Sequence, residues 1–177
     1  MMILSLRSHA AGCALAVLCL APDAVAAQSA GTAPSDALGF GGLVGHASVD
    51  RPGASGGSIF SVILRGRRSA RFELSPAFTL LRGREANTTA NLAVELRALG
   101  SVQTGQLRLS AGPSLGLAVV EVLEDSDVES LIGGVVAAEF FVGPRFGIRG
   151  EARAAGYNGF SNGTTAWLVG VTYQFGS

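Results

Sequence analysis

The chain has 177 residues and a formal net charge of zero, with 13 acidic and 13 basic residues, and every basic residue is arginine. Charged residues make up only 15%, against roughly 25% in typical soluble domains, and the mean hydropathy is +0.40. This balance gives no indication of nucleic acid or of a strongly acidic partner. Beyond Leu20, no apolar run approaches the roughly 20 residues that a spanning helix needs, so the apolar residues must be distributed in another way.

Residues 1–27 have the features of a secretory signal peptide. Arg7 precedes the apolar run AAGCALAVLCLA, and Ala24-Val25-Ala26 supplies the small residues of a cleavage site. Cleavage would remove the two cysteines, Cys13 and Cys19, so no disulfide is expected in the mature chain. We predict an exported protein with a short flexible leader over 28–36 and one domain over 37–177.

The domain is predicted to consist of eight β-strands, because apolar residues alternate with small or polar ones at a period of two. The strands are expected near 37–49, 58–67, 70–81, 88–98, 105–120, 130–142, 145–156 and 165–175. Most have the length of about ten residues that a tilted membrane-spanning strand requires. Short connections over 68–69, 100–104 and 143–144 alternate with longer ones over 49–57, 82–87, 122–129 and 158–164. Both ends of the domain are therefore expected on the short-turn side.

The two faces of the predicted sheet differ in chemistry. In ARFELSPAFTLL, Phe72, Leu74 and Phe78 share one face, and the same division recurs over 88–98, 105–120 and 145–156. The opposite face combines glycine, serine and alanine with charges of both signs. Its charged set comprises Arg71, Glu73, Glu95, Arg97, Arg108, Glu139, Arg149, Glu151 and Arg153. Pro76 and Pro113 fall inside strands, where each removes a ladder hydrogen bond, so bulges or strand ends are expected there.

Two architectures fit such a sheet. A soluble secreted or periplasmic barrel, lipocalin-like and binding an apolar ligand, would turn the apolar face inward. A membrane barrel would turn that face toward lipid, and with eight strands its interior is only wide enough for side chains to fill it. Small residues with a few opposite charges suit such an interior. We therefore predict an all-β fold, an eight-stranded antiparallel up-and-down transmembrane β-barrel.

The final strand, AWLVGVTYQF, places Trp167, Tyr173 and Phe175 on one face. Together with the export signal, the eight strands and the loop pattern, it resembles the small OmpA/OmpX-type outer-membrane barrels of Gram-negative bacteria. The resemblance covers essentially the whole mature chain and implies contact with outer-membrane lipid and lipopolysaccharide. In that family the aromatic last strand is recognised by the barrel-assembly machinery, a role that Tyr173 and Phe175 would take here. Gly176-Ser177 departs from the family's usual aromatic end.

Enzymatic chemistry is not expected. Some outer-membrane barrels deacylate lipid A with a histidine two positions before a Ser-Asn pair, but Ser161-Asn162 is preceded there by Gly159. A serine without a base is not an activated nucleophile. His46 is expected at a strand end or at the membrane interface. We predict no catalytic residue, no cofactor and no metal site.

Two features leave alternatives open. The acidic stretch EVLEDSDVES is either a divalent-cation site that bridges lipopolysaccharide phosphates or a solvated loop, and it lacks the glycine turn and ligand order of a calcium loop. The interior charges either line a narrow pore or form an ion-pair network that plugs the barrel. We predict a non-enzymatic protein with a structural, surface-interaction or restricted-pore role, with partners binding at the loops over 49–57, 122–129 and 158–164.

Overall fold

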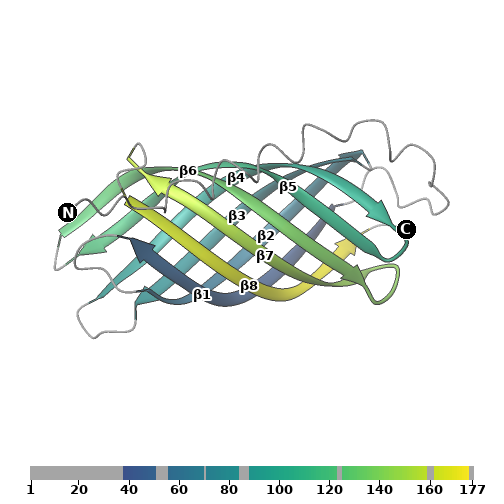
Figure 1. The fold of residues 1–177 in the computed structure, drawn as a ribbon, viewed down its shortest axis with the longest axis horizontal. Helices are drawn as coiled ribbons and strands as arrows, with labels where there is room; N and C mark the ends of the chain where they lie inside the picture. Colours follow the sequence, from purple (N-terminus) through teal and green to yellow (C-terminus); the bar gives the residue numbers. More distant parts are fainter. Residues whose placement is uncertain are drawn as a thin grey trace, which may run out of the picture.

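The protein is a closed β-barrel. The computed structural model describes residues 38–50, 56–69, 71–83, 88–122, 125–158 and 162–175. The strands are β1 (Leu38–Asp50), β2 (Gly57–Ser69), β3 (Phe72–Gly83), β4 (Thr88–Thr104), β5 (Leu107–Val122), β6 (Asp125–Phe141), β7 (Phe146–Tyr157) and β8 (Asn162–Phe175). Each pairs antiparallel with its neighbours, and β8 lies beside β1 and closes the sheet (Figure 1). The predicted fold class is confirmed.

The barrel has two ends, which we name by their connections. At the tight-turn end β1 begins, β8 ends, and the β2–β3, β4–β5 and β6–β7 connections lie; the other connections lie at the loop end. None of the described segments is a helix long and apolar enough to cross a membrane. The predicted signal peptide (1–27) and leader (28–36) lie outside the described residues, as do 51–55, 84–87, 123–124, 159–161 and Gly176-Ser177.

Two of the predicted connections are strand instead. β4 continues through 100–104 to Thr104, and the turn falls at Gly105, whose φ of 58° favours glycine. At the loop end, Val122 pairs with Asp125, so most of 122–129 belongs to a hairpin of β5 and β6. These stretches are polar, and polarity suggested loops. Backbone ladder bonds need a partner strand rather than apolar side chains, so the pairing continues through them.

The apolar face of the sheet points outward. All eight strands contribute large hydrophobic residues that are exposed, among them Phe40, Leu64, Phe78, Leu96, Leu115, Phe140, Ile148 and Val171. The charged face points into the barrel, where its side chains are buried. The lipocalin-like alternative requires the opposite arrangement and is wrong. Closure also pairs the strand edges that would otherwise expose backbone groups to lipid.

Both strand prolines lie within the ladder rather than at bulges or strand ends. On one side, Pro76 of β3 pairs with Leu96 of β4. On the other side it lies opposite Leu64 of β2, where the β2–β3 pairing is interrupted between Ile63 and Gly66. Because proline has no N–H, it cannot donate to a carbonyl across the ladder. The hydroxyl of Ser75 donates to the Leu64 carbonyl oxygen at 2.8 Å instead. An inward-facing serine thus supplies a hydrogen bond at the position where the ladder loses one.

The seam between β1 and β8 depends on glycine. A Cβ atom at Gly45 would lie 1.8 Å from the Trp167 carbonyl oxygen, and one at Gly170 would lie 1.9 Å from the Gly42 carbonyl oxygen. No side chain fits at such distances, so the two strands approach as they do only because these positions lack one. The seam runs along the whole of β1, from Leu38 opposite Phe175 onward.

Candidate functional site

Eleven charged side chains of the described residues are buried in the barrel. Glu129 is the one on the β5–β6 hairpin at the loop end, and we call the other ten the interior charge cluster. They are four glutamates, Glu73, Glu95, Glu139 and Glu151, and six arginines, Arg65, Arg67, Arg97, Arg108, Arg149 and Arg153, none more than 8% exposed. They come from β2 to β7 and lie in the middle and tight-turn parts of the barrel. The two-residue alternation turns them inward, and closure of the sheet brings opposite strands within side-chain reach.

Arg65 crosses the interior. Its Nη1 and Nη2 atoms donate to Glu139 at 2.6 and 2.8 Å, and Nη2 also donates to Glu73 at 2.7 Å. In the strand order of the barrel, β2 and β6 lie opposite one another, so this contact spans the barrel. Paired, charge-assisted bonds from one guanidinium are among the strongest that side chains make.

Glu151 organises the rest of the cluster. It accepts hydrogen bonds from Arg149 Nε at 2.7 Å, Arg153 Nε at 2.8 Å and Arg97 Nη1 at 3.3 Å. Arg149 Nη1 lies 3.7 Å from Glu73 Oε1, which joins this part to the bridge at Arg65. The ion pairs therefore form one connected network across the barrel.

The interior charge cluster contains more cations than anions. Six arginines face four glutamates, which leaves an excess of two positive charges. Several buried guanidinium nitrogens have no hydrogen-bond partner in the described part of the chain, including Arg67 Nη1, Arg108 Nε and Arg149 Nη2. Burial of an uncompensated charge is costly.

Toward the loop end, apolar side chains share the interior with charged ones. We call the following buried residues of β1, β2, β3 and β8 the interior apolar cluster: Leu43, Ala47, Ile59, Ile63, Ala77, Leu81, Ala166 and Leu168. A smaller group, Ala93, Ala118, Leu131 and Tyr157, fills the side formed by β4 to β7. The two chemistries overlap along the barrel, because Ala77 pairs with Glu95, Leu168 with Glu151 and Ala166 with Arg153. The apolar side chains thus fill the side formed by β8, β1, β2 and β3, next to the charged ones.

Eight of the nine charged residues predicted to face the interior belong to the interior charge cluster. Arg71 does not, because β3 begins at Phe72 and leaves Arg71 exposed in the β2–β3 turn. Sequence reasoning missed Arg65 and Arg67. Both share a face with Ser61, but Ile63 lies on that face too, and its apolar side chain masks the alternation along β2.

The predicted lipid-facing aromatic residues all lie on the outer face. Trp167 is 72% exposed toward the loop end, opposite His46 in the register. At the tight-turn end Tyr173 packs against Phe146, Phe175 and Phe40, with ring centroids 4.9, 5.2 and 5.9 Å apart. These rings form an aromatic girdle across β7, β8 and β1, of the kind found at membrane interfaces.

The acidic stretch divides between the two faces of the hairpin. Asp127 is exposed, whereas Glu129 is buried on the inner face. Among the described residues, no three histidine, cysteine or acidic side chains gather closely enough to hold a metal ion. Glu124 lies outside the described residues, as does Ser161.

A closed order of eight antiparallel strands, an apolar exterior and a charged interior define a transmembrane β-barrel of the small outer-membrane type. Solved structures share this fold. Neisserial surface protein A aligns with a TM-score of 0.62 and 16% identity over 78% of this chain and 97% of its own. Ail of Yersinia pestis, solved in complex with the heparin analogue sucrose octasulfate, aligns at 0.51 with 14% identity over 79% and 97%.

OprG, an outer-membrane protein of Pseudomonas aeruginosa, aligns with a TM-score of 0.51 and 10% identity over 83% of this chain and 99% of its own. At these identities the likeness concerns the fold. No protein-family model matches the chain, and no curated protein sequence matches it.

Proposed function

We propose that this chain is a non-enzymatic integral protein of the Gram-negative outer membrane, with its barrel closed to solutes. Its role is structural or lies in surface interaction at the loop end. The observation that carries the proposal is the filling of the interior, by the bridge from Arg65 to Glu139 between opposite strands and by the interior apolar cluster. The outward apolar side chains and the aromatic girdle support a position in lipid.

A restricted pore is the competing function within this class. It would need a continuous polar path through the barrel, whereas the interior apolar cluster fills the side formed by β8, β1, β2 and β3, and the paired charges of Glu95, Glu151 and Arg153 fill the side beside it. Both clusters support closure: the charged side chains are bound to one another in ion pairs, and Leu43 and Ile63 offer an ion no polar group in place of its hydration shell.

A surface role places partner binding at the loop end. Asp127 and Val128 are exposed on the β5–β6 hairpin there. Ail, which shares the fold, is an attachment invasion locus protein, and this likeness makes attachment to a surface partner the form of interaction to test first. Further partners under this proposal are outer-membrane lipid, lipopolysaccharide and, during biogenesis, the barrel-assembly machinery.

Membrane integration is tested by fractionation. The full chain, expressed in a Gram-negative host, is expected to be cleaved after Ala26 or Ala27, to stay with the membranes through a carbonate wash and to migrate differently in SDS gels before and after boiling. Recovery in the soluble fraction without detergent would contradict the proposal.

Closure is tested in planar bilayers. The folded protein is expected to produce no discrete current steps. The double variant Arg65→Ala with Glu139→Ala is also expected to produce none, because the interior apolar cluster remains. Adding Ile59→Ala and Ile63→Ala is expected to permit current. Each variant is checked for folding by its shift on boiling. Discrete steps from the unmodified protein would establish the restricted pore instead.

A further inference from the structure

We propose that the tight-turn end of the barrel binds one small monovalent inorganic anion of about the size of chloride, held by Arg67 and Gln174. We call this the mouth anion site. It lies in the barrel interior beside the bridge formed by Arg65, but none of the ion pairs described above uses Arg67 or Gln174.

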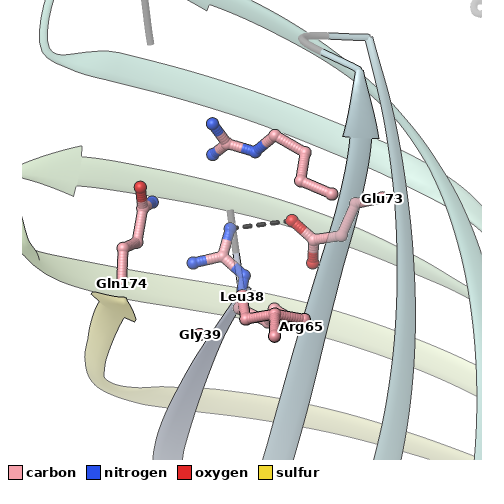
Figure 2. Close-up of a pocket in the computed structure, with 6 residues that line it drawn as sticks. Leu38, Gly39, Arg65, Glu73 and Gln174 are labelled. Carbon is pink, nitrogen blue, oxygen red and sulfur yellow. Dashed lines mark hydrogen bonds and ion pairs between the residues drawn. The ribbon is translucent and has the colours of Figure 1, made fainter. Parts of the chain in front are cut away.

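The site is a small, partly open space in the barrel interior. A cavity of about 10 Å³ is lined by Leu38, Gly39, Arg65, Arg67, Glu73 and Gln174. Figure 2 shows the guanidinium of Arg65 and the side-chain amide of Gln174 approaching this space from β2 and β8. A cavity of this volume holds about one water-sized body, so it suits a halide better than sulfate or phosphate.

Two buried hydrogen-bond donors at this cavity lack a partner. Arg67 is 7% exposed and Gln174 is 6% exposed, and neither Arg67 Nη1 nor Gln174 Nε2 donates to any atom of the described chain. A buried donor left unpaired costs free energy, so an occupant that accepts from both is favoured. Both nitrogens can only donate, as can the unpaired Nε of Arg65 beside them, so they favour an acceptor. The one unpaired buried side-chain acceptor among the described lining residues, Glu73 Oε1, lies 3.7 Å from Arg149 Nη1.

The charge around the cavity selects an anion rather than water. Arg67 makes no ion pair in the described structure, because the carboxylate of Glu73 is engaged by Arg65 at 2.7 Å and lies 3.7 Å from Arg149. The interior charge cluster already has two more arginines than glutamates. A water molecule would satisfy the hydrogen bonds but would leave that excess of charge; a monovalent anion reduces it.

The first experiment compares urea unfolding of the folded barrel in detergent, in chloride and in isethionate at equal ionic strength. A ligand that binds only the folded state raises the unfolding midpoint with its concentration. We expect a saturable rise in chloride and in bromide but not in isethionate. The rise is expected to disappear in Arg67→Gln and to persist in Arg145→Gln, which changes an exposed arginine of the β6–β7 connection.

A second variant guards against misfolding of Arg67→Gln. Gln174→Glu places a carboxylate next to Arg67 and supplies the missing negative charge from the chain itself. It is expected to unfold at a higher midpoint in isethionate than the unmodified protein and to have lost the response to chloride. An unchanged chloride response in Gln174→Glu or in Arg67→Gln would overturn the proposal.

Crystals of the unmodified protein grown in bromide give a direct readout. The proposal expects an anomalous peak within hydrogen-bond distance of Arg67 Nη1 and Gln174 Nε2. A water molecule there without anomalous signal would overturn it.

Discussion

The interior charge cluster and the interior apolar cluster close the same barrel with opposite chemistry. In the first, Arg65, Glu73 and Glu139 depend on one another, because removal of any one takes a counterion from the buried charges that contact it. In the second, Leu43 and Ile63 only exclude water, and each neighbour can move slightly to fill lost volume. The comparison teaches that a buried network concentrates stability in a few residues, whereas an apolar layer distributes it.

The largest expected effect is that of Glu139→Leu. The Glu139 carboxylate lies 2.6, 3.5 and 3.9 Å from Arg65, Arg108 and Arg149. The substitution would remove this counterion from all three arginines. We expect the free energy of unfolding to fall by about 3–5 kcal/mol, the usual cost of breaking a buried ion pair. Urea unfolding in lipid vesicles measures it. Asp127→Leu, at an exposed acid on the same strand, serves as the control and is expected to change little.

A double-mutant cycle between Arg65→Met and Glu139→Leu sharpens the comparison. Because each side chain is the other's partner across the barrel, we expect a coupling energy of about 2 kcal/mol. A second cycle combines Ile59→Val in the interior apolar cluster with Glu139→Leu in the interior charge cluster, two residues that share no contact. Their effects on the free energy of unfolding are expected to be additive within about 0.5 kcal/mol. Equal coupling in both cycles would show that the clusters act as one unit.

The smallest effect is expected in the interior apolar cluster. Ile63→Val removes one methylene from a fully buried side chain and is expected to lower the free energy of unfolding by about 1 kcal/mol. The same urea titration measures it. A loss as large as that of Glu139→Leu would contradict the contrast between the two clusters.

The fold was accessible from the sequence because its signal is local. Alternation along β3, β5 and β7 sets which side chains face inward, and the tight turns set the strand order, so Glu73, Arg108 and Arg149 could all be assigned to the interior. The exact strand ends were less accessible. Polar residues near Thr104 and Asp125 lie in paired strands, and the pairing depends on the neighbouring strand rather than on their own chemistry.

The contacts within the site could not be predicted in the same way. That Arg65 would reach Glu139, 74 positions along the chain, depends on barrel closure and on the stagger between strands. The missing partner of Arg67 is likewise a property of the whole network, since its nearest carboxylate, Glu73, is taken by other arginines. Sequence alternation identifies which side chains enter the interior but not how they pair there.

The glycine seam has a consequence for the order of events in folding. β1 and β8 are the first and last strands of the barrel, so their ladder can form only after every strand between them is present. Contacts between such distant segments carry a high loop-closure cost and form slowly. The hydrogen bonds between β1 and β8 are therefore expected to form last in the sheet. Until then the edges of β1 and β8 stay unpaired, and the protein is an open sheet until its last strand has docked.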